Sequence, residues 1–90
     1  MNFMVTYTFT PQHRAAAVAR FLETGAPAPK GATLIGRWHD ANLHRGFAVF
    51  EAADVESAAR VCHEWADLLT LEVVPVLDDA QLARVLAPAG

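Results

Sequence analysis

The stretch that decides the fold is Ala32-Thr-Leu-Ile-Gly-Arg-Trp-His39, followed by the turn Asp40-Ala-Asn-Leu43 and by His44-Arg-Gly-Phe-Ala-Val-Phe-Glu51. Both flanking segments are rich in β-branched and aromatic residues, which favour strands. Aspartate and asparagine suit the connection between them, because their side chains satisfy backbone groups of a tight turn. We therefore predict two extended segments, at about residues 33–39 and 45–51, that pair side by side.

One strand and one helix are predicted before this hairpin. Residues Phe3–Phe9 place a large apolar side chain at every second position, which is the period of a strand. Thr10 is a candidate N-cap, and Pro11 suits the first helical position because its missing N–H costs nothing there. Apolar residues recur at helical spacing over residues 15–22, and Gly25 supplies the left-handed residue that often ends a helix.

A second helix is predicted after the hairpin, with Asp54 as its N-cap. Its apolar positions follow helical spacing from Val55 to Leu69, with charged residues on the opposite side. The next apolar run, Leu71–Leu77, is predicted to be the fourth strand. Pro75 cannot donate to a strand ladder, so this strand is expected at a sheet edge or beside a bulge.

A short last helix completes the chain. Asp78 and Gln81 have the spacing of a capping box, and apolar residues follow at positions 82, 85 and 86. The element order is thus β-α-β-β-α-β with an added C-terminal helix. Right-handed crossovers fold this order into an α+β, ferredoxin-like plait, in which two helices cover one face of a four-stranded antiparallel sheet.

The composition indicates one small domain over residues 1–90 that needs a partner. Hydrophobic residues make up 53% of the chain and charged residues 19%, which excludes a disordered chain. A plait of this size and apolar content cannot cover its second sheet face from its own sequence. We therefore expect a homodimer in which a second copy covers that face.

Charge and cysteine content indicate which kinds of partner and which cellular compartment to expect. The net charge is −3 and Lys30 is the one lysine, so the chain lacks the clustered cations of nucleic-acid-binding proteins. No apolar run reaches the roughly 18 residues of a membrane span, and the start does not resemble a secretion signal. The single cysteine, Cys62, suits a reducing compartment. These features predict a cytoplasmic protein with neither nucleic-acid nor membrane partners.

Strict alternation along residues 33–39 predicts which side chains face which side of the sheet. The helix-covered side is expected to hold Leu34, Gly36 and Trp38. The open side would then carry Arg37 and His39, together with Thr6 and Thr8 from the first strand and Glu51 from the third. A mostly apolar face with a few convergent polar groups is typical of cavities that hold small organic ligands.

Each of these residues has a functional and a structural interpretation. Arg37 matches a ligand carboxylate or enolate with its planar fork, or it forms a salt bridge with an acidic residue across the dimer seam. His39 is a candidate general acid or base, or an exposed histidine at a strand end. Trp38 is either a core residue or a stacking platform. Tyr7 is expected to pack in the core with its hydroxyl at the rim, where it would contact a ligand oxygen.

Metal and cofactor sites are not predicted. His39, Asp40 and His44 flank one turn, but their spacing is not a recognised zinc signature. Cys62 lies on the apolar stripe of the second helix, where a thiol stays protonated. The sequence has no glycine-rich phosphate loop and no haem-attachment motif, so only cofactor-free chemistry or plain binding is expected.

Four segments of the chain resemble a small bacterial family of proteins of uncharacterised activity. They are the segments at Phe3–Phe9, Leu22–Pro27, Gly36–His39 and Leu71–Val76. The element order is similar to that of the dimeric α/β-barrel superfamily, which implies two plaits that pair through their open sheet faces and enclose a cavity in each subunit. Members of that superfamily include cofactor-free monooxygenases, isomerases and proteins without known chemistry, so the resemblance implies a fold more than an activity.

Together these features favour a homodimer that binds a small, partly apolar organic molecule in a cavity on the sheet. Arg37 would anchor an acidic or carbonyl oxygen, and the secondary contacts are expected from Thr6, Tyr7, Thr8 and Trp38. In the enzyme alternative, an isomerase, cyclase or monooxygenase, His39 moves a proton next to a carbonyl, Arg37 stabilises the enolate and Glu51 orients the imidazole. A structural or regulatory homodimer without a ligand is the second alternative.

Overall fold

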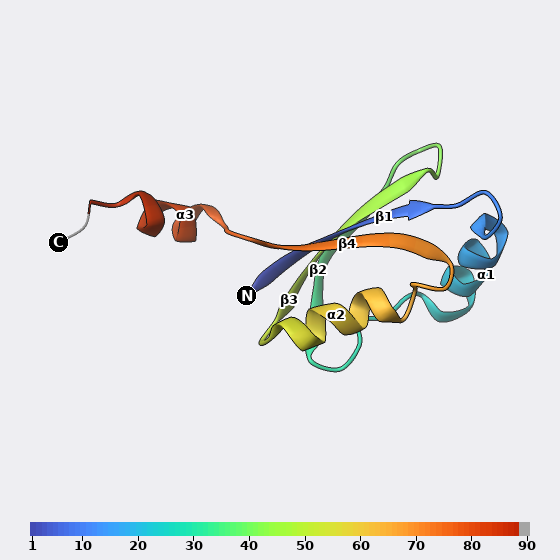
Figure 1. Cartoon of the computed structure of the whole chain (residues 1–90), viewed down its shortest axis with the longest axis horizontal. Coiled ribbons are helices and arrows are strands. Elements are labelled where there is room, and N and C mark those ends of the chain that lie inside the picture. The colour runs from blue at the N-terminus through green and yellow to red at the C-terminus, as the bar shows by residue number, and fades with distance from the viewer. Residues whose placement is uncertain (89–90) are drawn as a thin grey trace.

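The computed structural model describes residues 1–88 and confirms the predicted α+β, ferredoxin-like arrangement (Figure 1). Within that part of the chain the elements follow one another in the predicted order. They are β1 (Asn2–Phe9), α1 (Arg14–Thr24), β2 (Ala32–His39), β3 (Arg45–Ala52), α2 (Val55–His63), β4 (Leu69–Val76) and α3 (Asp79–Leu86).

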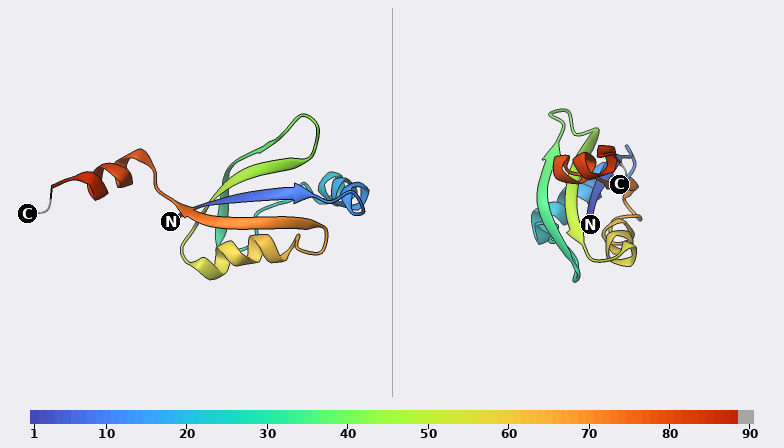
Figure 2. Two further views of the ribbon diagram at one scale, coloured as in Figure 1. Left: turned by 45° about the horizontal axis from the view of Figure 1, so that its top comes forward. Right: turned by 90° about the vertical axis from the view of Figure 1, so that its left-hand side faces the viewer.

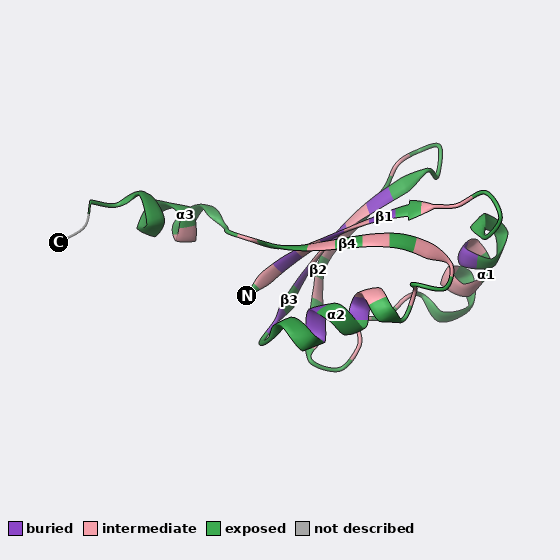
Figure 3. Ribbon diagram, viewed as in Figure 1, coloured by how far each residue is buried: buried purple, intermediate pink, exposed green. Residues whose placement is uncertain are grey.

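The strands form one antiparallel sheet in the order β2-β3-β1-β4. β1 and β3 lie in the centre, and they carry most of the buried strand residues (Figure 3). β4 is an edge strand, as the proline at position 75 predicted, because an edge position does not require every backbone N–H of the strand.

The core lies between the sheet and the helices. Phe3, Val5 and Tyr7 of β1 face the same side as Ala48 and Phe50 of β3, and all five side chains are at most 7% exposed. From α2, the buried residues on this side are Ser57, Ala58 and Val61. We call this side of the sheet the helix face and the opposite side the open face.

Local sequence signals account for three of the six helix ends. The Asp54 carboxylate accepts a hydrogen bond from the backbone N–H of Ser57 and begins α2. Gly25 ends α1 with a φ of 70°, and Asp78 and Gln81 form the predicted capping box of α3.

Two predicted helix ends were wrong. α1 begins at Arg14 rather than at the proline, because residues 11–13 form a turn in which the N–H of His13 bonds to the carbonyl of Thr10. α2 ends at His63, although apolar residues continue at helical spacing to Leu69. Pairing of Leu69 with Phe9 draws this residue into β4, so a long-range ladder overrides the local helical pattern.

The molecule is elongated, with principal extents of 54 × 27 × 17 Å. α1 lies at the end of the sheet where β1 finishes, and α3 projects beyond the opposite end (Figure 1 and the left-hand view of Figure 2). No helix within residues 1–88 is long and apolar enough to span a membrane.

Candidate functional site: a pocket between the sheet and two helices

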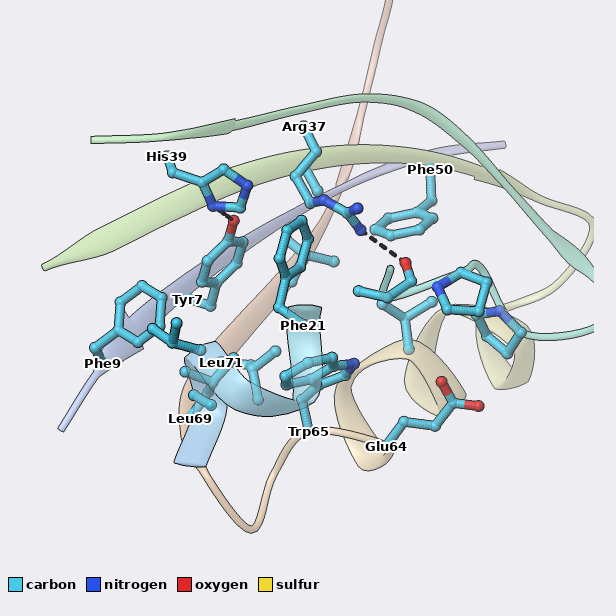
Figure 4. A pocket seen from close by; sticks show the side chains of 18 of the residues that line it. Tyr7, Phe9, Phe21, Arg37, His39, Phe50, Glu64, Trp65, Leu69 and Leu71 are labelled. Atoms are coloured by element: carbon cyan, nitrogen blue, oxygen red, sulfur yellow. Dashed lines mark hydrogen bonds between the residues drawn. The ribbon is translucent and has the colours of Figure 1, made fainter. Parts of the chain in front are cut away.

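A cavity of about 210 Å³ lies between the helix face and helices α1 and α2 (Figure 4). Its walls are almost entirely apolar, with aromatic rings from three elements: Tyr7 of β1, Phe21 of α1 and Phe50 of β3. Trp65, which follows α2, closes another side. The polar side chains that reach the pocket are those of Tyr7, His39, Arg37 and Glu64.

Arg37 and His39 point toward this pocket, so their predicted placement on the open face was wrong. The cause is a β-bulge between Leu34 and Gly36, where Ile35 is an extra residue in the pairing of β2 with β3. One inserted residue moves all later side chains to the opposite face. Beyond the bulge, Arg37 lies opposite Ala48 on the helix face.

The same bulge places Gly36 and Trp38 on the open face, where they were not expected. Trp38 is 62% exposed and its indole ring folds back over Gly36, so it is not a core residue. Gly36 therefore makes room for a side chain of its own strand rather than for a helix.

Tyr7 and His39 meet across an intervening strand. Both are register partners of Gly46, which lies between them on β3. Strands two apart in a sheet are about 10 Å apart, too far for most direct side-chain contacts. Since Gly46 has no side chain, the Tyr7 ring leans over it, and the Tyr7 hydroxyl hydrogen-bonds to Nδ1 of His39. Gly46 was not predicted to be part of the site.

The pKa values of both Tyr7 and His39 are shifted so that each side chain is neutral near pH 7. Burial raises the pKa of Tyr7 to about 12, although the nearby Arg37 charge opposes the shift. Burial and the same guanidinium lower the pKa of His39 below its usual 6.5. A neutral imidazole carries its hydrogen on one of the two ring nitrogens. Depending on the tautomer, either the Tyr7 hydroxyl donates to Nδ1 or Nδ1–H donates to the Tyr7 oxygen.

Arg37 holds the end of α1 against the sheet. Its guanidinium donates to the carbonyl oxygens of Ala26 at 2.8 Å and Gly25 at 3.2 Å, and it lies 5.2 Å from the centre of the Phe21 ring. A cation at a helix C-terminus is favourable because the last carbonyls carry partial negative charge. These bonds occupy N–H donors of Arg37 that were predicted to bind a ligand.

A second arginine attaches α1 to the segment after α2. Arg20 forms a two-pronged ion pair with Asp67, at 2.9 and 2.6 Å, and lies 5.2 Å from the centre of the Trp65 ring. Ala17 is the one buried residue of α1, all of which the structure describes. α1 is thus attached mainly by polar contacts at its sides, which leaves the space beneath it as the pocket.

The remaining predicted site residues lie on the open face, away from the pocket. Thr6 and Thr8 alternate with the buried residues of β1 and pair with Glu72 and Thr70 of β4. Glu51 pairs with Thr33 at the far end of β2, so it cannot orient the imidazole of His39. The structure therefore brings together Tyr7, Arg37 and His39, and it does not bring the threonines or Glu51 to them.

The turn between β2 and β3 uses its aspartate for backbone contacts. The Asp40 carboxylate accepts from the N–H groups of His44 at 2.8 Å and Arg45 at 3.1 Å, which lowers its pKa. Within residues 1–88, no group of three or more acidic, histidine or cysteine side chains is arranged to hold a metal ion. Burial raises the pKa of the Cys62 thiol, which favours its protonated, unreactive form.

A family model described as "Domain of unknown function (DUF3303)" matches residues 1–90. No curated protein matches the chain. The family match spans the sheet, the pocket and the C-terminal helix alike, and its description states no activity.

Proposed function

Because the chain belongs to the DUF3303 family, whose description states no activity, we propose a function from the pocket itself: the protein binds a small, mostly apolar organic molecule between its sheet and helices α1 and α2. The observation that carries this proposal is an apolar cavity of about 210 Å³ with one hydrogen-bonding pair at its rim. An engineered apolar cavity of about 150 Å³ is large enough to bind benzene. This pocket therefore suits a molecule of one or two rings.

The polar groups favour a neutral ligand that carries a hydroxyl or carbonyl group. Tyr7 and His39 are both neutral near pH 7, since the pKa of Tyr7 is raised and that of His39 is lowered. The Tyr7 oxygen can still accept a hydrogen bond from a ligand, and Nε2 of His39 is left to donate or to accept one, according to the tautomer. Arg37 already donates to two backbone carbonyls, so fewer of its N–H groups are available to a carboxylate.

A pocket-filling substitution tests this function. Ala48 is 2% exposed and lines the pocket, so the larger side chain of Ala48→Leu should occupy the ligand's space. We expect 2-naphthol to bind the wild-type protein and to bind Ala48→Leu at least about tenfold more weakly, a difference of about 1.4 kcal/mol. Calorimetry would give the affinities, and NMR shifts of the methyl groups of Val61, Leu69 and Leu71 would locate the ligand.

Val49→Leu is the matched control, because Val49 is the next residue of β3 and faces the open side. It should leave the affinity for 2-naphthol unchanged. Naphthalene-2-carboxylate, which has the same rings and a negative charge, should bind more weakly than 2-naphthol. Equal affinities of the Ala48 and Val49 variants, or NMR shifts confined to the open face, would contradict the proposal.

A cofactor-free enzyme is the second candidate function, and the Tyr7–His39 hydrogen bond is the observation that favours it. In the tautomer whose Nδ1–H donates to the Tyr7 oxygen, Nε2 of His39 is unprotonated and can take a proton from a carbon next to a ligand carbonyl and return it, as an isomerase requires. Tyr7 would then fill the orienting role that was predicted for Glu51.

Proton exchange at an enolisable ketone separates the enzyme from the binding protein. 2-Tetralone is a two-ring ketone of suitable size, and NMR follows the replacement of its acidic hydrogens in deuterated water. For an enzyme, His39→Gln should slow the protein-catalysed exchange by roughly 100-fold or more while binding of 2-tetralone persists. Exchange no faster with wild-type protein than in buffer would argue against catalysis and leave the binding function.

A further inference from the structure

α3 forms an apolar arm that the rest of residues 1–88 does not bury. None of its residues, all of which the structure describes, is buried. Its stripe of Leu82, Val85 and Leu86 is 44%, 67% and 72% exposed. Isolated helices shorter than about 12–15 residues are marginal in water, and α3 has 8 residues. Its stable form therefore requires a surface on which the stripe packs.

The open face of the sheet carries polar residues such as Thr6 and Glu51, and it also carries exposed apolar side chains that the rest of residues 1–88 leaves uncovered. Ile35 and Trp38 of β2 and Val74 of β4 are between 49% and 62% exposed there. No helix crosses this side within the described residues, since α2 packs on the helix face and α1 lies across the pocket from that face. Single exposed apolar residues are common in monomers, but a group of them on one face indicates an interaction site.

The amount of exposed surface matches what a dimer buries. The chain exposes 6134 Å², whereas a compact monomer of 9.7 kDa exposes about 5,100 Å². The excess of about 1,000 Å² is close to the area of about 800 Å² that each partner contributes to a standard interface. The radius of gyration agrees: it is 15.0 Å, against about 12 Å for a compact domain of this length.

From these observations we infer that α3 is an exchanged arm, and that its stripe of Leu82, Val85 and Leu86 packs on the open face of a second copy of this chain, beside Ile35 and Trp38. The connection from β4 is the two residues Leu77 and Asp78, and Asp78 is extended, with a φ of −80° and a ψ of 176°. This extended connection carries α3 past the end of its own sheet rather than back over it (Figure 1). A second copy related by twofold symmetry offers the same open face and receives the arm, while its own arm returns the contact.

Aspartate substitutions on the arm and on the receiving face, each made in the 90-residue chain, test the inference. Val85→Asp puts a carboxylate in the arm's stripe, and Trp38→Asp puts one on the receiving face. By sedimentation, the wild-type protein should have twice the chain mass of 9.7 kDa, and each variant alone should have the chain mass. Ala80→Asp is the matched control, because position 80 lies on the side of α3 opposite the stripe and should leave the dimer intact.

Mixing the two variants distinguishes an exchanged arm from other dimers. The Trp38→Asp chain keeps an intact arm and the Val85→Asp chain keeps an intact face, so the mixture should form a heterodimer through one arm–face contact. A dimer made by face on face, or by arm on arm, would not recover on mixing. Ile35→Asp serves as a second face variant if circular dichroism shows that Trp38→Asp does not fold. A wild-type protein at the chain mass, or a mixture that stays monomeric, would overturn the inference.

Discussion

Phe50→Ala is expected to remove about 3–5 kcal/mol from the free energy of unfolding. Phe50 is 5% exposed, pairs with Phe3 and Leu34 on the neighbouring strands, and forms part of the pocket wall. Its ring is shared by the core and the pocket, so its loss leaves a cavity that the sheet cannot close. A domain of this size has a total stability of about 5–15 kcal/mol, and the thermal midpoint should fall by roughly 15–30 °C.

Urea unfolding measures this loss, with Leu22→Ala as the control. Leu22 is 77% exposed on α1, so its truncation should change stability by no more than about 0.5 kcal/mol. The larger pocket of Phe50→Ala should also be stabilised by saturating 2-naphthol, by about 2.7 kcal/mol at a ligand concentration of 100 times Kd. A loss below about 1 kcal/mol would contradict the place of Phe50 in the core.

Most of the fold follows from signals that act over a few residues. The alternation of β1, the carboxylate of Asp54, the left-handed Gly25 and the capping box of α3 each specify structure within about one helical turn or one strand. The order of elements then determines the sheet, because few connections are compatible with right-handed crossovers. The predicted fold was confirmed for this reason.

The site depended on a single inserted residue that strict alternation could not reveal. Extrapolating a period of two from Leu34 through Ile35 put Arg37 and His39 on the wrong face. Gly36 was the available signal, since a glycine inside a strand often marks a bulge. Because one slip inverts all later positions, a small error in β2 moved the predicted pocket from one side of the sheet to the other.

Other features of the site arise only when distant segments pair. Gly46 has a role because the registers of β1 with β3 and of β3 with β2 place it between Tyr7 and His39, which are 32 residues apart. The end of α2 likewise depends on the pairing of Leu69 with Phe9. Strand registers cannot be obtained from a local sequence pattern. The role of Gly46 and the end of α2 were therefore not predictable from the residues alone.

Gly46→Ala is expected to break the link between Tyr7 and His39 and to destabilise the protein. A Cβ at position 46 would collide with the Tyr7 ring and hydroxyl, and that ring is 7% exposed with little room to move. Overpacking of this kind costs about 1–3 kcal/mol. The reduced entropy of the unfolded chain offsets about 0.4–1 kcal/mol, since the backbone of Gly46 is not in the left-handed region and alanine can adopt it. The steric cost is the larger effect.

A double-mutant cycle with Tyr7→Ala tests the cause of this loss. Without the tyrosine ring the new methyl group has nothing to collide with, so Gly46→Ala should then be neutral or slightly stabilising. Urea midpoints of the four proteins give the coupling between the two positions. An equal loss in both backgrounds would show that the glycine acts through the backbone rather than through Tyr7.

The titration of Tyr7 provides an independent measurement, because it is the only tyrosine in the sequence. Burial raises its pKa to about 12 from an ordinary value of 10.0, so the unfolded chain loses this proton first as the pH rises. The resulting contribution to stability is complete below pH 10 and is lost as the pH approaches 12. In Gly46→Ala the displaced ring should be better hydrated, and the midpoint of its phenolate absorbance should move down toward 10. If the midpoint stays near 12 in that variant, Gly46 is not the residue that allows Tyr7 to reach His39.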